Sequence, residues 1–219
     1  MPLVLVTPPT TLPNEHEAVK RLFDTGLERL HVRKPEQSIA AHRGYLKNIP
    51  PEYRNRVVLH DFHELVQEFD LGGVHFRERQ LPVLPIVAPP RRTVSIGFHH
   101  AKLTQASRGE VDYCFLSPIF SSISKAGYCP PPELRDHTLL AKYLEAASHP
   151  VLALGGVSTD TFGALADMGF AGVAMLGAIW GAADPVAALE QALDADAKTN
   201  WRPLKRWPFV DVQLATVKG

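Results

Sequence analysis

The sequence has little cysteine, no long apolar run and no excess of charge of either sign. Two cysteines in 219 residues, Cys114 and Cys129, cannot build a disulfide framework, so we expect one buried thiol and one loop thiol. Every apolar run ends at Gly, Pro or a charge well before the roughly 20 residues of a membrane helix. Lys plus Arg and Asp plus Glu number 23 each, which argues against nucleic acid as the main partner.

The first residues also lack the features of a leader. They contain no basic segment and no small-residue cleavage site, so they predict a strand that opens the fold and not a signal peptide. With 45% apolar and 21% charged residues, the chain should form a compact soluble globule. We therefore expect a cytoplasmic location and no membrane contact.

Short apolar runs recur along the chain, with amphipathic segments of helical spacing between them. Such mostly apolar runs are typical of parallel strands that are covered on both faces. Eight of them are present, at residues 3–6, 29–32, 57–59, 73–76, 93–97, 112–116, 151–154 and 172–176. A strand and then a helix, repeated in this way, predict a single α/β domain with a (β/α)₈ TIM barrel fold.

Two local features refine this prediction. Ser158 and Gly169 bracket one helical segment as an N-cap and a C-cap would, whereas the proline-rich stretch at 81–90 predicts a very short or degraded fourth helix. A doubly wound open sheet is the competing topology. It normally has a Gly-rich turn after its first strand, but residues 7–11 read Thr-Pro-Pro-Thr-Thr, which favours the barrel.

The periodicity stops near residue 195, so we divide the chain into a barrel of residues 1–195 and a C-terminal tail of residues 196–219. The tail is basic and aromatic, with Trp201 and Trp207 among its residues. This composition could bind single-stranded nucleic acid. In a chain without net charge, we favour a tail that packs its tryptophans on the barrel or on a neighbouring subunit.

Catalytic groups of a barrel lie at the carboxyl ends of its strands. The residues that follow the predicted strands are His31, Arg33 and Lys34; His60 and Asp61; His75 and Arg77; His99 and His100; residues 121–125; Gly155 and Gly156; and Gly177. Glycines after the last two strands match the phosphate site of many barrels, because an oxyanion can approach a backbone that carries no Cβ. The alternative is that they only make tight turns.

Ten histidines invite a metal-site interpretation. The obvious starting pairs are His60 with His63 and His99 with His100. We give these pairs little weight, because His60 should end a strand while His63 starts a helix, and neighbouring strand residues point to opposite faces. Asp61 at a strand end is a better ligand for Mg²⁺, which needs only one or two protein carboxylates.

Taken in order, the strand ends resemble the thiamine-phosphate synthase and thiazole tautomerase superfamily. The resemblance runs from about Leu3 to Leu193 and is carried by residues 30–33, 59–61, 73–76, 115–120, 154–157 and 172–179. It implies an enzyme of thiamine biosynthesis, a transferase that joins hydroxymethylpyrimidine diphosphate to thiazole phosphate carboxylate and releases diphosphate. It also implies small phosphorylated partners, with a homo-oligomer left open.

The resemblance assigns roles to particular residues. His31, Arg33 and Lys125 become the candidate catalytic residues, with Arg33 and Lys125 on the diphosphate. Asp61 becomes the Mg²⁺ ligand, although the second acidic position of the synthase pattern is Gln80 here. Substrate and phosphate binding fall to Ser122, Ser124, His99, Gly155, Gly156, Leu176 and Gly177.

Other residues leave two alternatives open. The synthase pattern has a Lys where this chain has Pro35, and Lys34 is displaced by one position. His31 is more similar to the tautomerases, which move a proton on a thiazole phosphate carboxylate and use neither diphosphate nor metal; His31, His99 or His100 could then act as acid or base. The catalytic His of that group, however, corresponds to Pro118 here. A non-catalytic paralogue that binds thiazole or thiamine phosphate is the third hypothesis.

Overall fold

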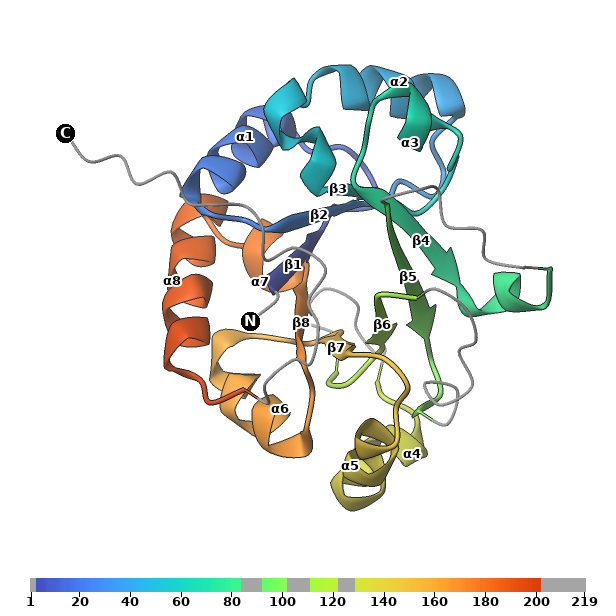
Figure 1. The fold of residues 1–219 in the computed structure, drawn as a ribbon. Coiled ribbons are helices and arrows are strands. Elements are labelled where there is room, and N and C mark those ends of the chain that lie inside the picture. Colours follow the sequence, from blue (N-terminus) through green and yellow to red (C-terminus); the bar gives the residue numbers. More distant parts are fainter. Residues whose placement is uncertain (1–2, 84–91, 102–110, 122–128, 202–219) are drawn as a thin grey trace.

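The structure, a computed structural model, describes residues 3–83, 92–101, 111–121 and 129–201. In this part of the chain, eight parallel strands close a barrel in sequence order, and helices surround it (Figure 1). The strands are β1 (Leu3–Val6), β2 (Arg29–Val32), β3 (Val57–Leu59), β4 (Gly73–Arg77), β5 (Thr93–Phe98), β6 (Tyr113–Leu116), β7 (Val151–Leu154) and β8 (Gly172–Met175). The predicted TIM barrel is confirmed, and the predicted strands agree with these bounds to within one residue at each end.

Pairing between β1 and β8 closes the barrel. Leu3 lies opposite Val173 and Leu5 lies opposite Met175, in parallel register. An open doubly wound sheet would leave β1 and β8 unpaired at its edges or place them inside a different strand order. The competing topology is therefore wrong.

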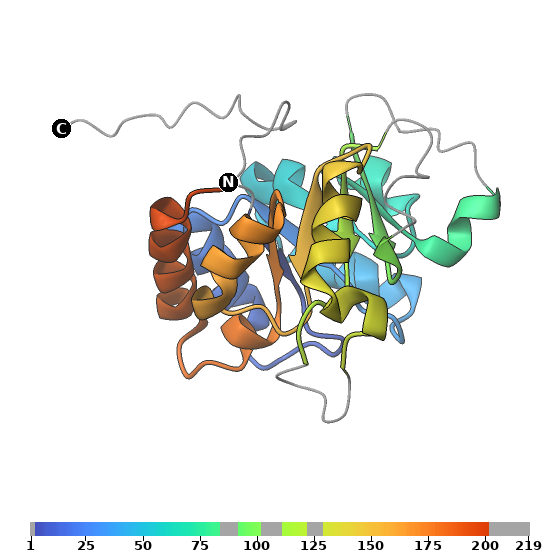
Figure 2. The same ribbon diagram turned by 90° about the horizontal axis from the view of Figure 1, so that it is seen from below.

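Helices cover the outside of the barrel (Figures 1 and 2). They are α1 (Glu15–Thr25), α2 (Ile39–Lys47), α3 (Leu65–Glu68), α4 (Pro132–Arg135), α5 (His137–Glu145), α6 (Phe162–Met168), α7 (Gly177–Trp180) and α8 (Pro185–Lys198). The 3₁₀ helices are η1 (Pro51–Arg56), η2 (Glu78–Val83) and η4 (Thr159–Thr161). In the described part of the chain, no helix has the length and apolar character needed to span a membrane.

The predicted helix signals are also found. Ser158 makes a capping box with Thr161 ahead of α6, and Gly169 ends α6 at φ 95°. After β4 the described residues form only the 3₁₀ helix η2, which agrees with the expected degraded unit. Helix α8 continues to Lys198, three residues past the predicted end of the barrel at 195. Beyond it, the ring of Trp201 packs 5.7 Å from that of Phe162, and Trp207 lies outside the described residues.

Alternation along each strand separates two cores. The residues that face outward join the helices in one large apolar cluster, whereas a smaller cluster fills part of the barrel interior. The interior cluster consists of Val4, Val6, Tyr113, Phe115, Leu152 and Ala174, from strands β1, β6, β7 and β8. The inward positions of β2, β4 and β5 instead carry buried polar residues, namely Arg29, His31, His75, Thr93 and Ser95. This polar half of the barrel leads directly to the candidate site.

The two cysteines behave as expected. Cys114 is a buried thiol on β6 and Cys129 an exposed thiol, and both are free.

Candidate functional site

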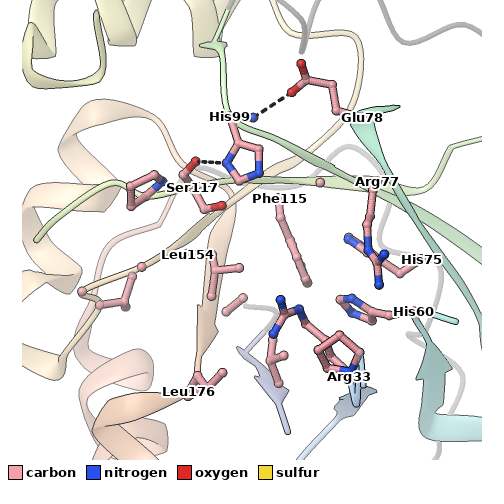
Figure 3. Close-up of a pocket in the computed structure, with 18 of the residues that line it drawn as sticks. Arg33, His60, His75, Arg77, Glu78, His99, Phe115, Ser117, Leu154 and Leu176 are labelled. Carbon is pink, nitrogen blue, oxygen red and sulfur yellow. Dashed lines mark hydrogen bonds between the residues drawn. The ribbon is translucent and has the colours of Figure 1, made fainter. Parts of the chain in front are cut away.

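A cavity of about 730 Å³ opens at the carboxyl ends of the strands. Strand ends around the ring contribute to its wall, among them Val6 on β1, Arg33 after β2, His75 on β4, Phe115 on β6 and Leu154 on β7. Figure 3 shows the side chains of Arg33, His75, Phe115 and Leu154 around the cavity. The volume suits a small molecule of drug or metabolite size.

Glycines form one side of the cavity, after β7 and β8. Gly155 and Gly156 have φ values of 91° and 67°, in the region that side chains with a Cβ rarely adopt. A Cβ on Gly156 would lie 2.4 Å from the Ser121 carbonyl oxygen, so this position needs glycine for space as well. Leu176 and Gly177 line the cavity beside them. This side therefore offers a ligand mainly backbone, as the sequence predicted for a phosphate site.

Charged side chains form the opposite side, after β2, β4 and β5. Arg33 and Arg77 both line the cavity, and Figure 3 shows their guanidinium groups on the same side of it. Nη2 of Arg77 lies 2.7 Å from each carboxylate oxygen of Asp61. Glu78 Oε2 accepts the backbone N–H of His99 at 3.0 Å, and the His99 ring bonds the Ser117 carbonyl through Nδ1 at 2.8 Å.

Three buried histidines lie between these two sides, beneath Arg33 and Arg77. His60 and His75 stack with their ring centroids 4.0 Å apart and line the cavity, whereas His31 lies below them with no exposed surface. His31 Nδ1 is 2.9 Å from His60 Nε2, and its Nε2 is 2.6 Å from the Tyr113 hydroxyl. His75 Nδ1 is 2.8 Å from Ser95 Oγ. The hydrogen bonds are satisfied when the neutral Tyr113 donates to His31 and His31 donates to His60.

Burial keeps these groups neutral. Desolvation is the largest cause that lowers the pKa of His31 and His60 well below the usual value, and it lowers the pKa of His75 to about 3. The positive charges of Arg33 and Arg77 lower the pKa values of His60 and His75 further. The cavity floor is therefore uncharged near neutral pH, and the arginines carry the positive charge of this side.

Lys34 takes no part in the cavity. Its ammonium is fully buried behind β2, 2.8 Å and 2.9 Å from the two carboxylate oxygens of Glu15, and it also donates to the Thr10 carbonyl at 3.2 Å. Tyr45 donates to the same carboxylate at 2.7 Å. Side chains alternate in direction at the strand end, so Arg33 faces the cavity and Lys34 ties α1 to the barrel.

The predicted site residues thus separate into three groups. Arg33, His99, Gly155, Gly156, Leu176 and Gly177 line one cavity. His31 lies under its floor, with both ring nitrogens engaged by His60 and Tyr113, and Asp61 lies beside it in the ion pair with Arg77. Ser122, Ser124 and Lys125 lie outside the described residues.

The histidine pairs singled out in the sequence do not form a metal site in the described residues. His63 bonds the His75 carbonyl at 3.2 Å, and His100 pairs with Glu133 at 2.6 Å, away from His99. The described residues place three candidate ligands together elsewhere, because one nitrogen from each of His31, His60 and His75 lies within 4.8 Å of the others. Their hydrogen bonds to one another, to Tyr113 and to Ser95 account for this closeness.

Magnesium does not fit the described residues. It prefers carboxylate oxygens, and both oxygens of Asp61 already contact Arg77. Gln80, at the second acidic position of the synthase pattern, accepts the backbone N–H of Arg77 through Oε1 at 2.6 Å. Among the described residues, Asp61 belongs to no group of three or more side chains that could hold a metal ion.

Two members of the polar network were not singled out in the sequence. Tyr113 and Ser95 occupy inward positions of β6 and β5, where they hydrogen-bond His31 and His75. Both lie in runs that read as apolar strands, so composition gave no signal. Alternation gave a signal for Ser95, which stands between the outward apolar residues Val94 and Ile96.

A barrel with a cationic wall and a glycine wall facing each other at the carboxyl ends of its strands belongs to the class of enzymes that act on small phosphate esters. Comparisons with known proteins narrow this class. Residues 3–179 match the family model described as thiamine monophosphate synthase, so the chain belongs to that family. The resemblance inferred from the strand ends is confirmed.

Individual relatives agree. The chain is 27% identical to a thiamine-phosphate synthase of Limosilactobacillus fermentum, in an alignment that covers 68% of this chain and 70% of that protein. It is 28% identical to the crystal structure of a thiamine phosphate pyrophosphorylase from Bacteroides thetaiotaomicron, with a TM-score of 0.72 over 90% of this chain and 98% of the other. A thiamine phosphate pyrophosphorylase from Pyrococcus furiosus shares the fold, with a TM-score of 0.69 at 19% identity.

Proposed function

We propose that this chain is a thiamine-phosphate synthase that joins hydroxymethylpyrimidine diphosphate to thiazole phosphate carboxylate and releases diphosphate. One observation carries the proposal beyond family membership: a single cavity has two chemically different walls, arginines on one side and glycine backbone on the other. Two phosphorylated substrates that must meet at one point need two such anion sites.

The glycine wall suits the thiazole phosphate. Phosphate oxygens can approach the backbone at Gly155, Gly156 and Gly177 because no Cβ intervenes. Gly156 has space for nothing larger than hydrogen at Cα, since the Ser121 carbonyl and Phe120 lie against it. A phosphate held here places the ring of its substrate over Phe115 and Leu154 in the cavity.

The arginine wall suits the diphosphate. Charge accumulates on the leaving diphosphate as its bond to the pyrimidine methylene breaks, and guanidinium groups fixed beforehand stabilise that charge without reorganisation. Arg33 is positioned for this role by the end of β2 and Arg77 by the end of β4. We retain the prediction that Lys125, Ser122 and Ser124 also contact the diphosphate.

His31 is assigned a positioning role in this scheme. It has no exposed surface, so it cannot touch a substrate, and it holds His60 through the 2.9 Å contact between their ring nitrogens. His60 in turn forms part of the cavity wall beside Arg33 and Arg77.

The direct test supplies both substrates to the purified protein and measures diphosphate release and thiamine phosphate formation, for which the carboxylate of the thiazole substrate leaves as CO₂. We expect stoichiometric formation of the two products, with a large loss in Arg33→Gln. Thermal stabilisation by thiazole phosphate without any turnover would contradict the synthase and support a non-catalytic binding protein.

The tautomerase remains a second candidate through His99, the histidine of the earlier set that lines the cavity from an exposed position. A tautomerase would accelerate aromatisation of the thiazole without any pyrimidine substrate, and His99→Ala would abolish that acceleration. His99→Ala with unchanged synthase turnover and no tautomerase activity in the parent protein would remove this candidate.

We also propose a cytoplasmic location, where phosphorylated intermediates are made and consumed, and self-association into a homo-oligomer. Light scattering of the purified chain tests the latter, and a monomer at micromolar concentration would contradict it.

A further inference from the structure

In the synthase pattern, two positions bind a divalent cation. In this chain these positions are Asp61 and Gln80, and both form hydrogen bonds with Arg77. Asp61 receives Nη2 of Arg77 at 2.7 Å on each oxygen. Gln80 receives the backbone N–H of the same residue at 2.6 Å. One side chain fixes the guanidinium and the other fixes its backbone, so Arg77 is held at the place where a cation would be expected.

The ion pair leaves most of the guanidinium available to a ligand. Its contacts to Asp61 use Nη2, and Nε and Nη1 of Arg77 have no hydrogen-bond partner among the described residues. Arg77 lines the cavity, and its side chain is 29% exposed in the ion pair. The N–H groups on Nε and Nη1 can each donate a charge-assisted hydrogen bond to a phosphate oxygen.

Arg33 lies on the same wall. Figure 3 shows its guanidinium facing the cavity near that of Arg77, with the ring of His60 close by. Two guanidinium groups, from the ends of β2 and β4, can therefore contact the two phosphate groups of a diphosphate.

We infer that Arg77 replaces the divalent cation in this chain, so that Arg33 and Arg77 bind the diphosphate group directly and binding needs no Mg²⁺. The inference rests on the proposed function only for the identity of the ligand, a diphosphate ester. Asp61 then acts as a positioning residue that orients Arg77, and not as a metal ligand.

Isothermal titration of the full chain with inorganic diphosphate tests this, once in EDTA and once in excess MgCl₂. Free diphosphate is corrected for its complex with Mg²⁺. We expect dissociation constants that agree within about twofold. Tighter binding in Mg²⁺ by about tenfold or more would overturn the inference.

Variants assign the effect to Arg77. Arg77→Gln should weaken diphosphate binding in EDTA by about tenfold or more, because charge-assisted hydrogen bonds are lost. Arg77→Lys keeps the charge but presents it from a single nitrogen, so its affinity should lie between those of the parent protein and Arg77→Gln. Binding by Arg77→Gln in EDTA equal to that of the parent protein would overturn the inference.

A matched control is Arg43→Gln. Arg43 also pairs with a carboxylate through two nitrogens, at 2.7 Å and 2.8 Å to Glu68, but on the exposed outer surface of the barrel. Its removal should leave diphosphate binding unchanged. Melting temperatures of all variants show whether a loss of binding reflects a loss of folding.

The outcomes separate this inference from the proposed function. Diphosphate binding in EDTA without turnover of both substrates contradicts the synthase and leaves the arginine site intact. Turnover that strictly requires Mg²⁺, together with Mg²⁺-dependent diphosphate binding, overturns the arginine site and leaves the synthase intact.

Discussion

The barrel interior consists of two unlike halves. Strands β6, β7, β8 and β1 fill it mainly with apolar side chains, whereas β2, β4 and β5 fill it with histidines, hydroxyls and arginine. Both halves are buried. At the carboxyl ends of the strands, the apolar half continues into the glycine loops of the cavity wall. The polar half continues into the charged side chains of that wall. The difference in the core beneath therefore continues into the difference between the two walls of the cavity.

The halves are stabilised by different physical terms. Removing apolar volume from a tightly packed interior costs the transfer free energy and leaves a cavity. In the polar half, each buried group depends on a partner of the correct geometry, and an unpaired group costs its full desolvation. Truncation of a side chain should therefore destabilise the protein most in the apolar half. In the polar half, loss of a single hydrogen-bonding atom should be enough to lower the stability.

The largest effect is expected in the apolar half. Leu152→Ala removes a fully buried side chain of β7 and should lower the free energy of unfolding by about 2–5 kcal/mol. Urea denaturation measures it. Leu139→Ala on the outer helix α5 is the matched control, since Leu139 is 36% exposed and should change the stability little. Equal losses in the two variants would contradict a packed interior.

A change at the glycine wall comes next. Gly156→Ala places a Cβ about where the Ser121 carbonyl and Phe120 lie, at a φ of 67°. We expect a loss of roughly 1–3 kcal/mol from backbone strain, together with a large rise in the KM for thiazole phosphate. Gly44→Ala serves as the control, because nothing lies within 4 Å of a Cβ there. Unchanged KM in Gly156→Ala would exclude this wall as the phosphate site.

One hydroxyl that extends from the apolar half to the histidines of the polar half should give a smaller but distinct loss. Tyr113→Phe keeps the ring and leaves His31 Nε2 buried without its 2.6 Å partner. The expected cost is about 1–3 kcal/mol. Tyr53→Phe, at an exposed hydroxyl that bonds Asp24, should cost less. A Tyr113→Phe protein as stable as the parent would show that the network contributes nothing to folding.

The buried histidines should also make stability depend on pH. The unfolded histidines titrate near 6.5 and the folded His31, His60 and His75 do so far lower, so the unfolded state binds more protons as the pH falls below 6.5. Stability should be full above this pH and decrease below it, by at most about 1.4 kcal/mol per pH unit for each histidine. Urea midpoints from pH 8 to pH 5 measure the slope, and a flat profile would contradict neutral buried imidazoles.

His100 should change the stability with pH in the opposite direction. Its hydrogen bond to Glu133 raises the pKa of the imidazole, so this pair contributes stability at low pH and loses it as the pH rises. His100→Gln should therefore steepen the acid loss slightly, whereas His75→Gln should flatten it.

Strand positions could be predicted because apolar runs and the glycines that bound them are local signals. The strand predicted at 112–116 is found at Tyr113–Leu116, and the described part of the weak fourth unit is the short 3₁₀ helix η2, as expected for a stretch that contains Pro82. The rule that strand ends carry the site brought Arg33, His99 and Gly156 into one cavity.

Side-chain pairing could not be predicted in the same way. Lys34 looked like a displaced cation for the ligand, but it pairs with Glu15, 19 residues away on α1. The contact of Arg77 with Asp61 depends on how the ends of β3 and β4 lie side by side, which neither segment shows alone. Such pairs are set by the register between neighbouring strands and by the direction of each side chain, both products of the closed barrel.

The fluorescence of Trp180, at the end of α7, offers a way to measure ligand binding in the cavity. Its indole N–H donates to the Val6 carbonyl at 2.9 Å, and Val6 and Gly177, the first residue of the same short helix, both line the cavity. A ligand phosphate that settles on Gly177 perturbs this indole. Its fluorescence can therefore report thiazole phosphate binding without a label, and Trp180→Phe identifies the part of the signal that comes from the ligand site.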